Sequence, residues 1–419
     1  MLALSSRLQT AFTHLTPSIR RILLHSLLFG LALSIGDLLF NFYLVSLGYG
    51  KDTVGLLSTI FRFAAVLAGV PIGMLIDRAG PQRSIQIGLL VFALGWSMQL
   101  MMTELWALMI SQTIIGMAQI LTMTAVVPLL TNVTDDERRP AVFGLNASSG
   151  MVIGLLGGTF GGILPSIAAS FIQADPKATI AYRLALMAVV GLGLAAITPV
   201  LRLIPTTERH RAAQLGSNTP PLTARMLFHF AMPAFSLGIG AGAFLPFQNL
   251  FFREQFHLSD AVVGSILAWG SLSMGLGAMS GSLFSRRLGL KRASALLRLL
   301  ATPAILVMLL PILPISIIGF FLRGAFIGAS FPLNDALIMR ITPPSQRGTA
   351  VSVTSVTWSL GWALTSLVSG WSLQRYGFTS ALIIGAVSYV FSALAVMAIP
   401  DHLQEANPAY LAPDQNPQK

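Results

Sequence analysis

The chain has 419 residues, of which 54% are hydrophobic and only 10% are charged, and its mean hydropathy is +0.75. An average soluble protein carries about 25% charged residues, so this composition excludes an ordinary soluble domain and predicts a protein that lies in a lipid bilayer. The formal net charge is +11. We interpret it as a signal of membrane orientation and of contact with anionic lipid headgroups, not of nucleic-acid binding.

Long apolar segments follow one another along the chain. In lipid, backbone polar groups must be satisfied within helices or a closed barrel. Segments such as 85–102 and 184–200 are apolar on all faces, without the alternation of strands, which indicates helices. The sequence therefore predicts an all-α polytopic membrane protein. Twelve segments are long enough to span a bilayer: 19–47, 53–76, 83–102, 105–131, 140–164, 180–202, 226–250, 260–284, 293–312, 315–340, 348–371 and 378–399.

The positive charges predict the orientation. Residues 1–21 contain Arg7, Arg20 and Arg21 but no small-residue cleavage site, so we interpret them as a cytoplasmic lead-in. With twelve spans both termini lie on one side, and a cytoplasmic placement puts most of the 26 Lys and Arg residues in the cytoplasm. We expect a multi-pass protein of the plasma membrane with cytoplasmic termini. The basic residues expected on the other side are Lys51, Lys177, Arg183, Arg253 and Arg375.

Chemistry that requires a cofactor has no support in the sequence. The chain has no cysteine, and its six histidines do not cluster with carboxylates at metal-ligand spacing. No glycine-rich loop followed by Lys-Ser/Thr is present to bind nucleotide phosphates. We expect no enzyme activity, no metal and no cofactor, so any work must come from a gradient.

A motif between the second and third predicted spans has an eroded copy later in the chain. Gly73-Met-Leu-Ile-Asp77-Arg78-Ala-Gly80-Pro-Gln-Arg83 is repeated at residues 281–292, where Ser285 replaces the acid. Residues 41–55 similarly align with 249–264. These repeats predict two halves of six helices each: a bundle at 1–202, a polar linker at 203–225, a second bundle at 226–400 and a tail at 401–419.

The motif residues have physical roles of their own. Gly73 would let two helices approach closely, and Asp77 could accept hydrogen bonds from amides at the N-terminus of a neighbouring helix. Arg78 and Arg83 could pair with the acids at residues 135–137. An ordinary positively charged loop is the alternative.

The motif, the twelve spans, the duplication and the basic midpoint linker make the chain resemble the major facilitator superfamily over its whole length. In that family the matching motif latches the cytoplasmic side shut in the outward-open state. The resemblance implies a gate formed by Gly73, Asp77, Arg78, Gly80 and Arg83, with Asp77 near Thr349.

A second motif is similar to the antiporter signature of the 12-helix drug:proton branch. It comprises Gly157, Gly158, Gly161 and Gly162, with Gly158 where proline is usual. Gln112 stands where that branch usually has an arginine, which weakens the case for its proton-coupling arrangement. Close helix packing is the alternative explanation of the glycines.

Charged residues inside the membrane are costly, which makes them functional candidates. Asp37 and Arg62 lie about equally far from the turn at 49–50, so we expect them at one depth and within reach of each other. They form either a proton-coupling pair or a permanent structural pair. Arg323 either faces the central cavity, which would then favour an anionic or neutral substrate, or extends toward the headgroups. For Arg298 and Asp335, near cytoplasmic span ends, pairing or such extension is favoured.

Polar and aromatic residues within spans are candidates for the cavity lining, although packing and interhelical hydrogen bonds explain each of them equally well. Trp358 and Trp362 share a helix face. The full set is Gln112, Gln119, Asn146, Gln248, Asn249, Trp358 and Trp362.

The favoured function is secondary active transport by alternating access, as proton-coupled export of a small amphipathic molecule. Uptake of a small organic anion held by Arg62 and Arg323 is the alternative. From a different class, the chain could be a non-transporting receptor or a lipid scramblase on the same scaffold. The expected partners are a small-molecule substrate, protons and membrane lipids, with the monomer sufficient for function and no nucleic acid.

Overall fold

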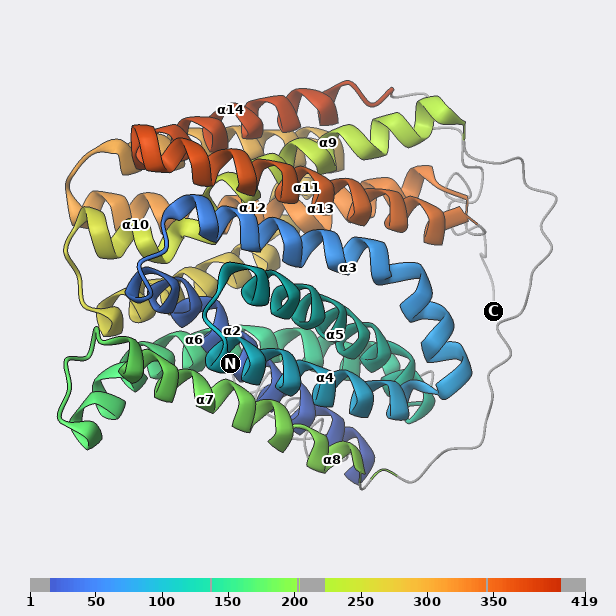
Figure 1. Cartoon of the computed structure of the whole chain (residues 1–419). Helices are drawn as coiled ribbons and strands as arrows, with labels where there is room; N and C mark the ends of the chain where they lie inside the picture. The colour runs from blue at the N-terminus through green and yellow to red at the C-terminus, as the bar shows by residue number, and fades with distance from the viewer. Residues whose placement is uncertain (1–15, 136–137, 202, 204–222, 344–345, 401–419) are drawn as a thin grey trace, which may run out of the picture. The chain divides into compact units, whose positions relative to one another are not determined.

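A computed structural model describes residues 16–135, 138–201, 203, 223–343 and 346–400, whose helices are drawn in Figure 1. The regular structure in these ranges is helical, and no strand occurs in them, which confirms the all-α prediction. The helices in chain order are α2 (Pro17–Ser46), α3 (Lys51–Ala79), α4 (Pro81–Met101), α5 (Leu105–Asn132), α6 (Arg139–Ile172), α7 (Thr179–Ala195), α8 (Ile197–Leu201), α9 (Ala224–Phe244), η1 (Leu245–Phe247), α10 (Gln248–Gln255), α11 (Asp260–Leu306), η2 (Val307–Leu309), α12 (Leu313–Ile341), α13 (Arg347–Tyr376) and α14 (Phe378–Met397).

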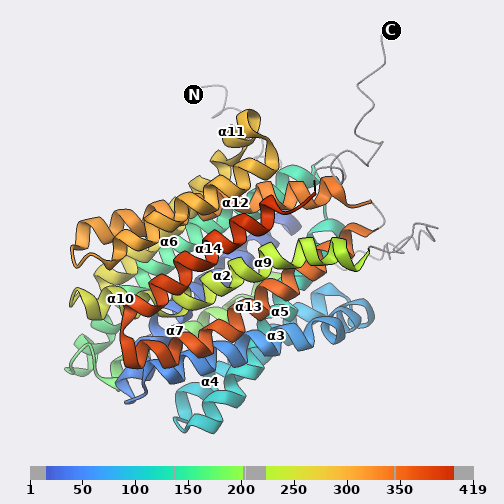
Figure 2. The same cartoon turned by 90° about the horizontal axis from the view of Figure 1, so that it is seen from above.

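Eleven helices in the described ranges are long and apolar enough to cross a membrane, one fewer than the twelve predicted spans. The difference lies in α11, which contains the eighth span and most of the ninth. Its 47 residues would extend for about 70 Å if straight, more than twice the thickness of a bilayer core. Gly289 has a non-helical φ of 76°, so two helices meet at a kink there (Figure 2). The chain is a multi-pass membrane protein.

The duplication is visible in the backbone of two turns. Gly80 separates α3 from α4 with a φ of 82°, and Gly289 has nearly the same φ at the corresponding position of the second repeat. Glycine is favoured at such left-handed positions because it lacks a Cβ. The aligned segments 41–55 and 249–264 also share one: Gly48 has a φ of 89° and His257 a φ of 52°. The repeated motif therefore has a structural role in both repeats, although its acid is lost in the second.

The chain divides into two compact units. Unit 1 is Met1–Ala212 together with Asn249–Leu272, and unit 2 is Ala213–Gln248 together with Ser273–Lys419. Residues 249–272 belong to the second repeat by sequence but pack in unit 1. The predicted domain boundaries stay a prediction, because most of the predicted linker and the predicted tail lie outside the described residues.

Unit 1 is held together by close packing of its helices. α2 packs against α6 and α7, and α5 packs against α3 and α4. A Cβ at Gly116 of α5 would lie 2.5 Å from the carbonyl oxygen of Phe61 on α3, so these two helices touch through their backbones. Small residues at such contacts are typical of membrane helices, where close van der Waals packing drives association.

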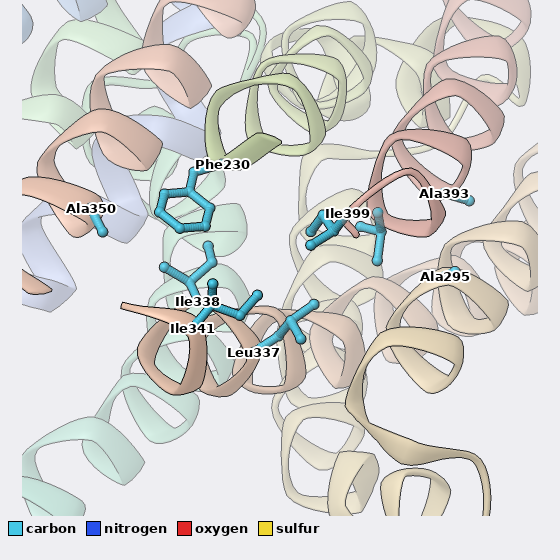
Figure 3. Packing of buried hydrophobic residues seen from close by; sticks show 9 residues of the cluster. Phe230, Ala295, Leu337, Ile338, Ile341, Ala350, Ala393 and Ile399 are labelled. Atoms are coloured by element: carbon cyan, nitrogen blue, oxygen red, sulfur yellow. The ribbon is translucent and has the colours of Figure 1, made fainter. Parts of the chain in front are cut away.

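Unit 2 has the same kind of packing. α9 lies against α13 and α14, and glycines of α9 contact the backbone of α13 at Trp358 and Trp362. Apolar side chains from α9, α11, α12, α13 and the region of α14 pack together near the ends of these helices (Figure 3). The buried members of this cluster are Phe230, Ala295, Leu337, Ile338, Ile341, Ala350, Ala393, Val396 and Ile399.

Candidate functional site

Asp37 on α2 and Arg62 on α3 interact electrostatically within unit 1. This agrees with their equal distance from the turn between the two helices. Arg62 is half-buried, and its guanidinium carbon lies 5.8 Å from the centroid of the Phe61 ring. An acid and a base have therefore been brought together at the middle of two apolar helices, where an unpaired charge would be costly.

The side chain of Asp37 is exposed, whereas its neighbours Gly36 and Leu38 are buried. α2 thus turns its apolar face toward α6 and α7 and presents the carboxylate on a different face. A carboxylate that faced lipid hydrocarbon would be expensive to maintain, so intramembrane acids usually face a protein interior or water. The exposed carboxylate is available for protonation and for exchange of its partner.

Arg323 on α12 lies in the interior of unit 2 and is only 5% exposed. Its Nε donates to the Tyr389 hydroxyl at 2.7 Å, and its guanidinium carbon lies 5.5 Å from the centroid of the Phe244 ring. This placement corrects both interpretations made from the sequence, because the side chain neither extends to the headgroups nor is largely open to solvent. Tyr389, which the sequence did not single out, fixes its orientation.

Arg298 on α11 has a structural environment. It is 1% exposed, and its Nη atoms donate to Ser392 Oγ at 2.7 Å and to Asn334 Oδ1 at 2.9 Å. Asp335 interacts with it electrostatically. The prediction of structural pairing agrees with this network, which ties α11 to α12 and α14.

Two of the predicted lining residues instead join neighbouring helices. Gln112 is buried, and its Nε2 donates to Oε1 of Gln99 at 3.0 Å, which links α5 to α4. Asn249 is also buried and bonds to α2: Asn41 Nδ2 donates to its Oδ1 at 2.8 Å, and its own Nδ2 donates to the Leu38 carbonyl at 2.7 Å. For both residues the alternative of interhelical hydrogen bonding holds in this structure.

The other predicted lining residues are more accessible. Gln119, Asn146 and Gln248 are half-buried. On α13 the ring centroids of Trp358 and Trp362 lie 5.0 Å apart with an interplanar angle of 63°, and Trp362 is the more buried of the two. Their role in binding a solute stays a prediction.

The glycines of α6 form two close contacts on opposite sides of that helix. On one side, a Cβ at Gly157 would meet Ser34 of α2, and one at Gly161 would meet Ile35 and Leu38. On the other side, a Cβ at Gly158 would lie 2.8 Å from the carbonyl oxygen of Gly264, and one at Gly162 would lie 2.6 Å from that of Asp260. Close packing accounts for all four glycines.

Comparison with known proteins settles the family. The family model of the Major Facilitator Superfamily matches residues 22–234 and again residues 230–413. The chain belongs to the Major Facilitator Superfamily. The two matches correspond to the two repeats, and together they cover nearly the whole chain.

Individual relatives of this superfamily member are more distant. The niacin transporter NiaP of Acinetobacter baylyi (strain ATCC 33305 / BD413 / ADP1) is 27% identical over 153 residues, which are 36% of this chain and 34% of the relative. A putative niacin/nicotinamide transporter NiaP of Bacillus subtilis (strain 168) is 24% identical over 81 residues, 19% of this chain and 20% of the relative. The chain thus matches about a third of the first relative's length and a fifth of the second's.

Solved structures share the fold over nearly the full length. The nucleoside transporter NupG has a TM-score of 0.74 at 16% identity, covering 91% of this chain and 99% of NupG. A D-xylose-proton symporter has a TM-score of 0.72 at 12% identity, covering 91% of this chain and 97% of the symporter. These proteins and the family are transporters, not enzymes. The matches identify the superfamily but not the drug:proton antiporter branch within it.

The superfamily motif at 73–83 lies at the end of α3 and the start of α4. Asp77, Arg78 and Arg83 are exposed, and Gly80 supplies the left-handed turn. A Cβ at Gly73 would meet no atom of the described residues within 4 Å, so the expected close helix approach at Gly73 is wrong for this structure. Of the expected acid partners, Asp136 and Glu137 lie outside the described residues.

Sequence reasoning missed several polar residues of unit 1. Asn41, Tyr182, Arg253 and Asp260 form buried polar contacts with one another or with Asn249. One signal was available: the repeat alignment places Asn41 opposite Asn249. Tyr182 carried no such signal, because its contact with Asp260 spans 78 residues.

Proposed function

We propose that this superfamily member is a secondary transporter that takes up a small organic carboxylate together with a proton by alternating access. The observation that carries the proposal is the contact between Asp37, whose side chain is exposed, and Arg62. Within a membrane such a pair is costly to keep, so it is a candidate for the site at which ions and substrate bind.

Charge balance explains how the pair would couple the two solutes. With the site empty, the carboxylate of Asp37 neutralises the guanidinium of Arg62. A proton that binds Asp37 removes that negative charge and leaves Arg62 unpaired, which is unfavourable in a medium of low dielectric constant. A substrate carboxylate restores neutrality by pairing with Arg62. Proton and anion therefore bind together more favourably than either alone, as symport requires.

The substrate class is supported by the curated relatives, because niacin is a small pyridine carboxylate and both relatives are described as niacin transporters. Arginine suits this class, since its guanidinium can bind a carboxylate through two parallel hydrogen bonds. Export of an amphipathic molecule has less support, because close packing explains the glycines that resemble the antiporter signature.

Uptake into proteoliposomes tests the proposal. With an inward proton gradient, we expect accumulation of radiolabelled nicotinate or another small aromatic carboxylate. Asp37→Asn should abolish gradient-driven accumulation while retaining exchange of labelled for unlabelled substrate, because a neutral side chain mimics the protonated state. Arg62→Gln should lose both. Asp52→Asn is a matched control, since Asp52 is an exposed acid at the start of α3.

Three outcomes would contradict the proposal. Gradient-driven accumulation in Asp37→Asn would remove the coupling role of this residue. Transport that is unaffected in Arg62→Gln would remove the anion site. Substrate that leaves the vesicles against an opposing proton gradient would establish export instead. The proposed orientation, with both termini cytoplasmic in the plasma membrane, is tested separately by the accessibility of a C-terminal tag in intact cells.

A further inference from the structure

Residues Asn249–Leu272 belong to the second repeat by sequence and to unit 1 by packing. They comprise α10 and the start of α11, and they correspond to the part of the first repeat that begins at Asn41. A segment of one repeat that is built into the unit of the other has to be held there by specific contacts. Those contacts fall into three groups, and each is made mainly by groups that water can also satisfy.

The first contact is an amide pair. Asn41 and Asn249 hydrogen-bond through their side chains, and Asn249 also donates to the Leu38 carbonyl of α2. Both asparagines are at least nine-tenths buried. A buried amide without a partner would cost about 1–3 kcal/mol, so this pair holds the segment only while both partners stay in place.

The second contact is a buried ionic cluster. Tyr182 Oη of α7 donates to Asp260 Oδ2 at 2.6 Å, and Arg253 Nε lies 3.4 Å from Asp260 Oδ1. The Arg253 guanidinium carbon also lies 4.5 Å from the centroid of the Phe42 ring. At 3.4 Å the ion pair is longer than a strong charge-assisted hydrogen bond, which measures about 2.7–2.9 Å. Asp260 is therefore held mainly by Tyr182, and the cluster is not tightly closed.

The third contact is the glycine face of α6. Gly158 and Gly162 lie directly against the backbone of α11 at Gly264 and Asp260. No side chains interdigitate at these points, so α11 can separate from α6 without pulling a side chain out of a pocket. An exposed ion pair between Lys51 and Glu254, at 2.6 Å, lies at the edge and contributes little.

We propose that the Arg253–Asp260–Tyr182 cluster and the Asn41–Asn249 pair form a latch, and that it releases residues 249–272 from unit 1 when the protein opens. The contacts differ from the large apolar cluster of unit 2, whose separation would expose hydrocarbon to water. Amides, carboxylates and guanidinium groups regain hydrogen bonds to water on release, so the cost of opening is small. The inference goes beyond the proposed function, because it does not depend on the solute or the coupling ion.

The absence of cysteine allows a test by labelling a single introduced thiol. Ala268 of α11 is fully buried and lies against Gly158, so the thiol of Ala268→Cys reports release of the segment. A membrane-impermeant maleimide is added to vesicles of both orientations without substrate. We expect Asp260→Asn to raise the labelling rate about tenfold from the side of the turn at 47–50, and Tyr182→Phe to raise it about threefold or more.

Tyr182→Phe keeps the ring and removes only the hydroxyl, so it guards against misfolding of the Asp260→Asn variant. The control thiol is Ala329→Cys, which is buried in an apolar cluster of unit 2 and should label slowly in every background. Labelling of Ala268→Cys at the parent rate in both variants would overturn the latch. An equal rise at Ala329→Cys would also overturn it, because the variants would then loosen the whole protein. A failed nicotinate assay would leave this result unaffected.

Discussion

Asn41 and Asn249 occupy corresponding positions in the two repeats, 208 residues apart, and their side-chain amides hydrogen-bond to each other at 2.8 Å. A contact between two equivalent residues is expected where a duplicated chain approaches its own symmetry axis. The pair is buried and lies one helical turn from Asp37. It connects the latch to the helix that carries the proposed coupling acid.

Cross-linking this pair should block transport. In the double variant Asn41→Cys/Asn249→Cys, an oxidant or a short thiol cross-linker should reduce uptake by at least about tenfold, because the segment 249–272 could no longer separate from α2. Reduction should restore uptake. The measurement is uptake of the labelled substrate before and after dithiothreitol.

Ser372→Cys/Ser380→Cys is the matched control for that cross-link. The two hydroxyls lie 2.7 Å apart at the turn between α13 and α14, within a single repeat. A bridge there should leave uptake unchanged. Persisting uptake in the fully cross-linked Asn41→Cys/Asn249→Cys protein would show that this contact does not have to open.

Replacement of Gly162 by alanine should weaken the packing of α6 on α11. The added Cβ would lie 2.6 Å from the Asp260 carbonyl oxygen, so one backbone must shift. Overpacking of this kind typically costs about 1–3 kcal/mol. We expect a lower melting temperature in detergent for Gly162→Ala and none for Gly144→Ala, where a Cβ meets nothing within 4 Å. Equal melting temperatures would argue that α6 and α11 are not in contact.

Removal of the buried arginine of α11 should destabilise the protein. Arg298→Met leaves Asn334, Ser392 and Asp335 without their shared donor, and loss of one partner of such a network costs about 3–5 kcal/mol. Thermal unfolding should shift clearly downward. Arg287→Met, at an exposed position of the same helix, should have little effect. A stable Arg298→Met protein would mean that the network is dispensable.

The motif acid provides a test of the cytoplasmic gate. Asp77→Asn removes a negative charge whose interaction with a helix N-terminus is worth about 0.3–1 kcal/mol or more, so we expect transport to fall a few-fold. Ser285→Ala at the corresponding position of the second repeat should be neutral. Initial uptake rates measure both. If Asp77→Asn is as active as the parent, Asp77 has no gating role, while the fold assignment is unaffected.

Much of the fold follows from one-dimensional properties of the chain. The length of the apolar segments predicted each span, and the predicted spans match the helices because lipid leaves the backbone no alternative to internal hydrogen bonds. The repeated motif predicted the turns at Gly80 and Gly289. The alignment of two intramembrane charges, Asp37 and Arg62, needed only the distance of each from one turn.

The surroundings of individual side chains could not be predicted in the same way. Spacing along a helix indicates which residues share a face but not which helix that face contacts. Arg323 and Gln112 were therefore expected to line a cavity, and they lie instead beside Tyr389 and Gln99.

The sequence by itself determined the fold class, the family and the depth of the charged pair, because hydrophobic length and local turn chemistry act over a few residues. Only the tertiary structure decided that residues 249–272 pack in unit 1 and that Asn41 meets Asn249, Tyr182 meets Asp260 and glycines of α6 meet the backbone of α11. These contacts depend on how distant helices pack, and packing is set by the shape complementarity of whole surfaces, which no short pattern in the sequence contains.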